Sequence, residues 1–558
     1  MLDYELFNVT DDHCYNIARA LNYCKACGED GLKFTNGIYH LYPEKASVRA
    51  VSVSNHDICG YTSIAMLLED MKDFTIDGGD SLFVSHGVMI TAAVINCENV
   101  TLRNFRFTVC APMRMEAVVT DCNEKHCVIE VVNDVSYYIR DGRLRFTDGY
   151  GHDDPYHYTM MMCRNGETGY MPETKQSFDK NLRFTQLEGR SMRLDNLLLE
   201  PEPDMKLILG PQLRHGCTVF LEHCKNSLIE NTSFRHSYAM GIIAQLCDTV
   251  TVHGMSVRPE GSGFSTNCDA THFVSCTGRI EVSDSYFEAM LDDAMNVHGI
   301  FTRIEMIEDD GILVRDMHPG SKGLSLYRPE DIIAVMNPKK LVSESSYTVD
   351  SVEVINQEYV FLKLREPTTY IQEGHVVENM SIMPEVIFKN NTVKDNRARG
   401  ILLASRGRIT VEGNRFHTPG CAILFESDGE MWYESGGTEE VMIKNNLFDN
   451  CGYARGEWGS AVIEIKPRKD FDGINYYHRH IAVKNNFFRK SEKLLFSAAD
   501  TKNIEFVDNI VPRDTYMTSY ENCKNITETN NVIGVFQPEP INLSLVDIAQ
   551  YVGTGEKL

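Results

Sequence analysis

The sequence predicts an all-β protein built on a parallel β-helix, with two inserted small antiparallel β-domains and a short N-terminal helix. Three observations support this fold class. Strand-like segments of one form recur along the chain, several of them at intervals of 23 residues. Two long gaps interrupt the recurrence, and each contains a hairpin pattern. Only residues 11–28 carry a clear helical pattern.

The helix is expected at the start of the chain, over residues 11–28. Asp11 or Asp12 can cap its first turn, and Gly28 is a stop signal. The residues that fall on one face are apolar, as in an amphipathic helix: Ile17, Leu21 and Cys24.

The recurring segments share three or four strand residues, then Asn, Asp or Gly at a bend, then an apolar residue. They are VTLRNFRF from Val100, LIENTSF from Leu228, VTVHGMSV from Val250, IEVSDSYF from Ile280, VIFKNNTV from Val386, ITVEGNRF from Ile409, VMIKNNLF from Val441, IAVKNNFF from Ile481 and IEFVDNIV from Ile504. The bend residues of three successive pairs are 23 residues apart: Asn231–Gly254, Asn390–Gly413 and Asn485–Asp508. A period of this size, with strands and no alternating helices, indicates a parallel β-helix whose coils stack on one another.

Paired asparagines stand at several of these bends, at 390–391, 445–446 and 485–486. Asn tolerates the left-handed backbone of a tight turn, and equivalent Asn residues in successive coils can stack as a ladder. We therefore assign these pairs to structure and not to sugar binding.

The two gaps predict inserted domains. The first, residues 111–215, contains YYIRDGRLRF, in which Asp141-Gly142 is a hairpin turn. The second, residues 301–384, contains VEVINQEYVFLKL, another hairpin pattern. The expected organisation is 1–110 for the helix and first coils, 111–215 for one insert, 216–300 for coils with candidate acids, 301–384 for the second insert, and 385–558 for the last coils and a tail.

Charge and composition narrow the possible partners. The chain of 558 residues has 54 basic and 79 acidic residues, a net charge of -25, and repels polyanions such as nucleic acid. It has no basic leader followed by an apolar core and no apolar run of membrane-spanning length. Its 17 cysteines are scattered. These features predict a cytoplasmic protein with no membrane or nucleic-acid partner; a homo-oligomer stays open.

An acid pair interrupts the apolar segment FEAMLDDAMNVHG, which begins at Phe287. Strand alternation would bury either Asp292 or Asp293, at a cost of several kcal/mol for an unpaired ion by the order of magnitude for buried charges. We therefore expect a bend that turns both outward. Asp269 lies 23 residues before Asp292, one coil away. Adjacent coils are about 4.8 Å apart, so three carboxylates are expected to share one surface.

Such a cluster can bind a hard cation such as calcium, or can divide into a protonated and an ionised acid for general acid/base catalysis. Solvated acids at a β-helix edge are the structural alternative. The convergence of three acids at coil spacing favours catalysis, and carboxylate pairs on extended sugar-binding scaffolds indicate glycoside hydrolysis. The sequence has no P-loop, GxSxG or HExxH motif, and we expect no cofactor.

Four segments resemble glycoside hydrolase family 110, the α-1,3-galactosidases that remove terminal galactose from blood-group-B-type and related glycans. They are SNHD from Ser54, TIDGGDSLFVSHG from Thr75, CDATHFVSCTGRIEVSDSYFEAMLDDAMNVHG from Cys268, and WYESGGTEEVMIKNNLF from Trp432. The resemblance spans roughly residues 35–510. It implies a right-handed β-helix, barrel-like inserts, and exo-acting hydrolysis with inversion. The implied substrate is a galactose-terminated oligosaccharide or glycoconjugate, linear or blood-group-B-type.

The resemblance also implies functional residues. It places the catalytic acids at Asp292 and Asp293, with Asp269 in support. By analogy with β-helical polygalacturonases, Asp292 is expected to be the acid, while Asp269 and Asp293 hold the water. Trp432 could stack on galactose and Glu434 could accept from its hydroxyls. Further substrate-binding candidates come from the resemblance or from adjacent-coil positions: Gln245, His298, Arg399 and His56.

Two other readings remain open from the sequence. A polygalacturonase-like hydrolase of uronic-acid polymers would need a basic cleft, which the overall acidity disfavours. A non-catalytic carbohydrate-binding β-helix would need no acid cluster at all.

Overall fold

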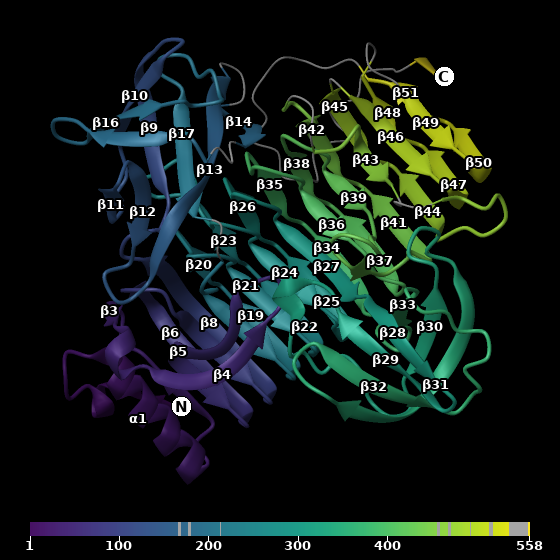
Figure 1. Cartoon of the computed structure of the whole chain (residues 1–558), viewed down its shortest axis with the longest axis horizontal. Helices are drawn as coiled ribbons and strands as arrows, with labels where there is room; N and C mark the ends of the chain where they lie inside the picture. Colours follow the sequence, from purple (N-terminus) through teal and green to yellow (C-terminus); the bar gives the residue numbers. More distant parts are fainter. Residues whose placement is uncertain are drawn as a thin grey trace.

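The computed structural model of the protein describes residues 1–165, 169–176, 180–211, 214–454, 458–466, 470–491, 493–512, 517–534 and 556–557. Most of this chain winds into a parallel β-helix (Figure 1), which confirms the predicted fold class. The one α-helix in the described range, α1 (His13–Cys27), lies at its N-terminal end. The Asp12 carboxylate caps α1, and Gly28 ends it with a left-handed φ of 69°. Most of the expected C-terminal tail lies outside the described residues.

A coil contains up to three strands, each stacked on its equivalent in the next coil. Two successive coils are β21 (Ile242–Gln245), β22 (Asp248–His253), β23 (Ser256–Val257), then β24 (Thr271–Val274), β25 (Thr277–Ser283) and β26 (Tyr286–Glu288). In the later coils Val386 lies opposite Ile409, and Ile481 opposite Ile504. Both pairs are 23 residues apart, as the sequence repeat predicted.

The stacked strands form two long parallel sheets. One contains, in order, β6 (Lys72–Ser85), β8 (Glu98–Val109), β19 (Lys225–Glu230), β22, β25, β34 (Glu385–Lys389), β37 (Arg408–Glu412), β41 (Glu440–Lys444), β44 (His478–Lys484), β47 (Thr501–Val507) and β50 (Lys524–Thr529). The other contains β5 (Ile58–Glu69), β7 (Ile90–Ile95), β18 (Val219–Glu222), β21, β24, β27 (Met295–Ile300), β36 (Ile401–Leu403), β39 (Ile423–Phe425), β43 (Ala461–Ile465), β46 (Leu494–Ala499) and β49 (Thr518–Glu521). The two sheets face each other across one core.

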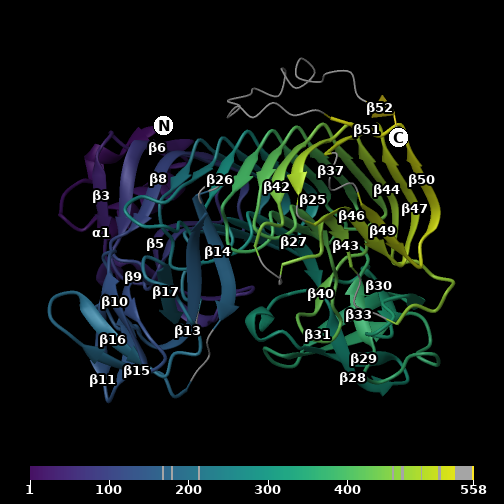
Figure 2. The same cartoon turned by 90° about the horizontal axis from the view of Figure 1, so that it is seen from above.

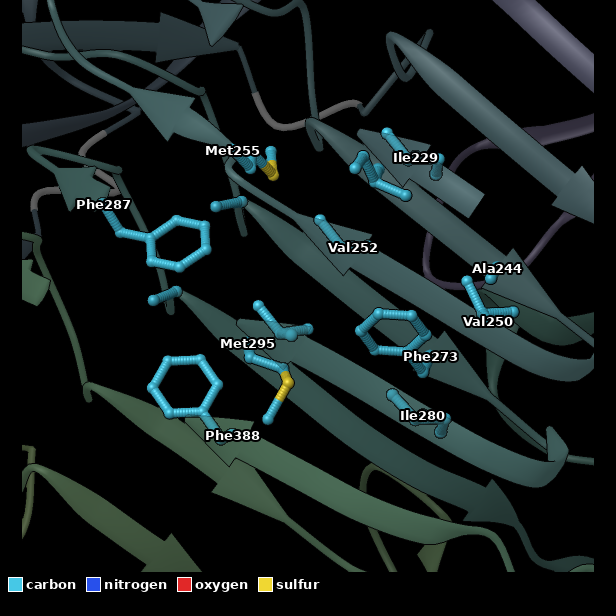
Figure 3. Packing of buried hydrophobic residues seen from close by; sticks show 14 of the residues in the cluster. Ile229, Ala244, Val250, Val252, Met255, Phe273, Ile280, Phe287, Met295 and Phe388 are labelled. Atoms are coloured by element: carbon cyan, nitrogen blue, oxygen red, sulfur yellow. The ribbon is translucent and has the colours of Figure 1, made fainter. Parts of the chain in front are cut away.

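Alternate strand residues fill that core in continuous stacks (Figure 3). Val250 and Val252 of β22 lie against the equivalent Ile280 and Val282 of β25. Phenylalanines stack in the same way, with ring centroids of Phe388 and Phe416 6.1 Å apart. Each coil therefore buries apolar side chains against its neighbours, and about 1.5–3 kcal/mol is gained for each large side chain that is fully buried.

The bend asparagines form the expected ladder. The backbone N–H of Asn391 donates to Asn414 Oδ1 at 2.8 Å, and that of Asn414 donates to Asn446 Oδ1 at 2.9 Å. The ladder continues through Asn486 and Asn509. The residues just before these amides often have a left-handed backbone, as at Asn390, Asn445 and Asn485. The paired asparagines therefore satisfy buried backbone groups, which confirms their structural role.

The first insert is an antiparallel domain that closes almost into a barrel. Its strands are β9 (Met115–Cys122), β10 (His126–Val131), β11 (Tyr137–Arg140), β12 (Arg143–Thr147), β13 (Asp153–Asn165), β14 (Gly169–Gln176), β15 (Arg183–Gln186), β16 (Ser191–Asp195) and β17 (Lys206–Pro211). Asp141 and Gly142 join β11 to β12 with positive φ values of 52° and 71°, as the predicted two-residue turn requires. Cys122 and Cys127 form a disulfide between β9 and β10.

The second insert is a closed barrel of six strands. They are β28 (Thr302–Glu308), β29 (Gly311–Asp316), β30 (Ile332–Met336), β31 (Ser343–Val354), β32 (Tyr359–Leu364) and β33 (Val376–Asn379). The hairpin expected from the sequence is β31–β32, with Val354 opposite Val360. Both inserted domains lie on the same side of the β-helix (Figure 2). Among the described residues, no helix has the length and apolar character to cross a membrane.

Candidate active site

The structure brings the three predicted acids together at one bend of the β-helix. Asp292 and Asp293 lie between β26 and β27, and Asp269 lies in the equivalent bend before β24. Thr271 is in register with Met295, which places Asp269 beside Asp293 in the next coil. The backbone N–H of Asp293 donates to Asp269 Oδ1 at 3.3 Å. An oxygen from each of the three carboxylates lies within 4.8 Å of the other two.

The acids differ in exposure. The side chain of Asp292 is 13% exposed, that of Asp269 is 6% exposed, and that of Asp293 is 1% exposed. Of the acid pair expected to turn outward, Asp292 lines a cavity, whereas Asp293 is covered by a neighbouring side chain. Arg399, from the next coil, covers this carboxylate with a two-pronged contact, Nη2 to Oδ2 at 2.6 Å and Nε to Oδ1 at 3.1 Å.

Asp269 and Asp292 line a cavity of about 420 Å³. The β-helix coils form its floor, and the first insert and a loop that includes Trp432 and Glu434 form its walls. Its lining includes Asn55, Arg114, His157, Tyr158, Arg214, Asn267, Cys268, His272, Leu291, Asn296, Arg397, Arg399, Leu402, Glu426, Ser427, Asp428 and Trp458. This volume is within the range of small-molecule sites.

Arginines balance the charge of the acid cluster. Arg214 Nη2 is 3.4 Å from Asp292 Oδ2, and Arg397 Nη2 is 3.7 Å from Asp292 Oδ1. With the Arg399–Asp293 pair, three cations face three acids. Because the arginines already compensate the negative charge, the cluster has little electrostatic attraction left for a hard cation.

Burial and the local charges shift the pKa values of the two cavity-lining acids in opposite directions. Burial, with the charge of Asp292, raises the pKa of Asp269 to about 7. Burial also pushes the pKa of Asp292 upward, but the charges of Arg397, Arg214 and Arg399 outweigh it, so the pKa of Asp292 is lowered. Asp292 is thus the more acidic of these two groups, and Asp269 can hold a proton near neutral pH. Burial also raises the pKa of Asp293 to about 7, but its two-pronged contact with Arg399 favours the ionised form. The assignment of Asp292 as the acid, made by analogy, stays a prediction that these pKa directions do not favour.

The chain is similar to known α-1,3-galactosidases over most of its length. Alpha-1,3-galactosidase A of Shewanella woodyi is 31% identical over 515 residues, which cover 90% of this chain and 83% of that protein. The chain belongs to the α-1,3-galactosidase family. Alpha-1,3-galactosidase B of Akkermansia muciniphila is 29% identical over 522 residues, which cover 90% of this chain and 65% of that protein. The resemblance found in the sequence is thereby confirmed.

A family model also matches part of the β-helix. Residues 375–536 match the family described as "Right handed beta helix region", in line with the right-handed coils that the resemblance implied. A solved structure, the exopolygalacturonase of Thermotoga maritima, superposes with a TM-score of 0.42 and 10% identity over 94% of this chain and 91% of that one.

In this member of the α-1,3-galactosidase family, three of the expected substrate-binding residues line the cavity. Arg399 does so beside the acids, and Trp432 does so with its side chain half exposed. Glu434 belongs to β40 (Glu434–Ser435), which pairs with the end of β27. Gly299 permits this close approach, because a Cβ there would lie 2.4 Å from Ser435 Oγ.

The other three expected substrate-binding residues do not line the cavity. Gln245 is fully buried on β21, where its amide bonds to Ser52, Ser54 and Glu222. His56 is buried and contacts the carbonyl oxygen of Ser54 at 2.9 Å. His298 lies behind the cavity wall, in contact with His272. Adjacent-coil position identifies residues near the site, but it does not show which side of the coil they face.

Sequence reasoning missed several lining residues of this family member. Arg397 could have been found, because it stands two residues before Arg399, in the same coil bend. Arg114, Arg214 and Trp458 had no such signal, since they come from connections whose course the repeat does not fix. His272 was overlooked although it stands three residues after Asp269.

Proposed function

We propose that the protein is an exo-acting glycoside hydrolase that releases terminal α-1,3-linked galactose from an oligosaccharide or glycoconjugate, linear or of the blood-group-B type. The observation that carries the proposal is the cavity of about 420 Å³ whose floor holds Asp269 and Asp292 with pKa values shifted in opposite directions. Two carboxyl groups with separated pKa values are what acid/base cleavage of a glycosidic bond needs. Relatives named α-1,3-galactosidase support the linkage and the sugar.

Unpartnered polar atoms in the cavity support a ligand rich in hydroxyl groups. The buried Nε1 of Trp458, Oδ1 of Asn267 and Oδ1 of Asn296 have no hydrogen-bond partner within the described structure. Arg114 also has unpartnered guanidinium nitrogens there. Buried polar atoms are rarely left unpaired, so we propose that small side-chain movements on binding bring these covered donors and acceptors to sugar hydroxyls. Trp432 offers an exposed ring for the apolar face of the sugar.

In the proposed reaction, Asp269 gives its proton to the departing oxygen and Asp292 takes a proton from the attacking water. Only these two members of the cluster line the cavity. Asp293 acts through its contact with Asp269 and its ion pair with Arg399. Glu434 and Arg399 line the cavity, and in this proposal they hold the galactose ring against the floor.

We propose inversion at the anomeric carbon, as the resemblance implies. The carboxylate oxygens lie within 4.8 Å of one another, less than the separation of about 6.5–9.5 Å usual for inverting enzymes. Inversion therefore requires Asp269 and Asp292 to move apart when the substrate binds, so that the departing oxygen lies beside Asp269 and the attacking water lies beside Asp292 on the opposite face of the sugar.

Galactose release from an α-1,3-linked galactoside tests the activity. We expect loss of at least a hundredfold in kcat/KM for Asp269→Asn and for Asp292→Asn, as is typical for removal of a general acid or base by about 10²–10⁴. Asp309→Asn, the same change on the exposed barrel surface, is the control and should remain active. Full activity in both site variants would remove the catalytic assignment. Release of β-galactose as the first anomer in proton NMR supports inversion, and α-galactose contradicts it.

A further inference from the structure

Behind Asp269, two buried histidines form a chain of hydrogen bonds that ends on a backbone carbonyl. Asp269 Oδ2 is 2.6 Å from His272 Nδ1, and His272 Nε2 is 2.9 Å from His298 Nε2. His298 Nδ1 is 2.7 Å from the carbonyl oxygen of Gly299. His272 lines the cavity beside Asp269, and the chain continues to His298 on the adjacent strand of the same sheet.

Strand alternation explains why the histidines meet. On β24 the neighbouring Phe273 points into the β-helix core, so His272 points out of it. On β27 Val297 points into the same core, so His298 points out beside His272. Both rings are almost completely buried. Because both polar rings are buried outside the apolar core, each needs hydrogen-bond partners, and the chain supplies them.

The fixed end of the chain determines how many protons it holds. The oxygen of Gly299 can only accept, so Nδ1 of His298 carries a hydrogen. Each of the other two contacts also needs one hydrogen between its atoms. Two neutral imidazoles supply only two of these three hydrogens. The third either protonates Asp269 or makes His272 an imidazolium, so the chain holds one proton more than an ionised Asp269 with two neutral rings.

Burial decides between these two states. It lowers the pKa of His272 well below its ordinary value, as does the neighbouring His298, whereas burial raises the pKa of Asp269. An ion pair of His272 and Asp269 would place two charges in a region without water, while the neutral state places none there. The titratable and charged groups that face the chain are Arg214, Arg399, Asp292, Asp293, Glu434, His56 and His318.

We propose that His272 and His298 are positioning residues that keep the proton of the acid cluster on Asp269, so that Asp269 enters the reaction as the proton donor. This inference rests on the proposed function. In the step, the O–H bond of Asp269 breaks as its proton goes to the departing oxygen. The bond from the anomeric carbon to that oxygen breaks with its electron pair, water forms the new bond, and its proton goes to Asp292. In this role both histidines act through Asp269, although His272 also lines the cavity.

The variant His298→Leu tests the chain. Without an acceptor for its Nε2, His272 is expected to move its hydrogen to Nδ1 and donate it to an ionised Asp269, which lowers the pKa of that acid. In the pH profile of kcat/KM for an α-1,3-galactoside, the alkaline limb should shift to lower pH by about one unit. At a pH on that limb, kcat/KM of the variant should therefore be about tenfold lower than that of wild type. His298→Gln keeps an acceptor oxygen and is the matched control, with a smaller shift expected.

A second substrate separates this role from damage to the fold. A nitrophenyl α-galactoside has a leaving group that needs no proton, so His298→Leu should cleave it at the wild-type rate near pH 7. An equal loss on both substrates at all pH values would overturn the proposal in favour of a structural role. An inactive wild type would instead refute the proposed function.

A measurement on the wild type keeps the inference testable if His298→Leu does not fold. The ¹⁵N shifts of His272 and His298, assigned by comparison with the His272→Gln and His298→Gln proteins, distinguish a neutral ring from an imidazolium. Two neutral rings at about pH 6 are expected. An imidazolium at His272 would place the proton away from Asp269 and overturn the proposal.

Discussion

The raised pKa of Asp269 predicts how one substitution changes stability with pH. An acid whose pKa is higher in the folded protein contributes stability that is complete below its unfolded value of 3.8 and is lost as pH rises through about 7. The part of this stability that is lost between about pH 5 and pH 7 covers two pH units, or about 3 kcal/mol at 1.36 kcal/mol per unit. Asp269→Asn has no charge to acquire, and its amide can donate to His272 as the protonated acid would.

We therefore expect the unfolding free energy of wild type to fall by about 3 kcal/mol relative to Asp269→Asn between about pH 5 and pH 8. Urea unfolding curves of both proteins at the two pH values measure this difference, and taking the difference removes the titration of the groups that do not interact with Asp269. Asp309→Asn serves as the control, and its difference from wild type should not depend on pH in this way. Parallel pH dependence in wild type and Asp269→Asn would refute the assignment of the proton to Asp269.

Two further predictions concern stability. Arg399→Met leaves the buried Asp293 carboxylate without its two-pronged partner and should lower the free energy of unfolding in urea by about 3–5 kcal/mol. Adding Asp293→Asn removes the unpaired charge and should recover much of this loss. No recovery would contradict the ion-pair argument. Asn446→Ala removes the acceptor for the backbone N–H of Asn414 and the donor to Val411, and should cost about 1–3 kcal/mol. An unchanged urea midpoint would show that the ladder contributes no stability.

Much of the fold could be predicted because its determinants are local. A β-helix coil repeats a strand, a bend and a strand, and an Asn or Gly at the bend supplies the left-handed backbone, as at Asn390 and Gly413. The same periodicity located the acid cluster. Asp269 and Asp292 are one coil apart in sequence, and stacked coils bring such residues within a few ångströms of each other in any β-helix.

The chemistry of the cluster depended on residues that no repeat connects. Arg114 and Tyr158 reach the cavity from the first insert, and Trp458 reaches it from a connection between later coils. Arg399 covers Asp293, and Arg214 and Arg397 hold the charge of Asp292. Their positions are set by how inserts and loops return onto the β-helix, which is a matter of packing between distant segments.

By itself, then, the sequence determined the β-helix, the two inserts and the meeting of three carboxylates, because all of these follow from spacing along one repeating coil. Only the tertiary structure decided which acid faces the cavity, which is covered, and which holds a proton. A pKa is set by burial and by charges in space, and the groups that set it for Asp269 and Asp292 lie far apart along the chain.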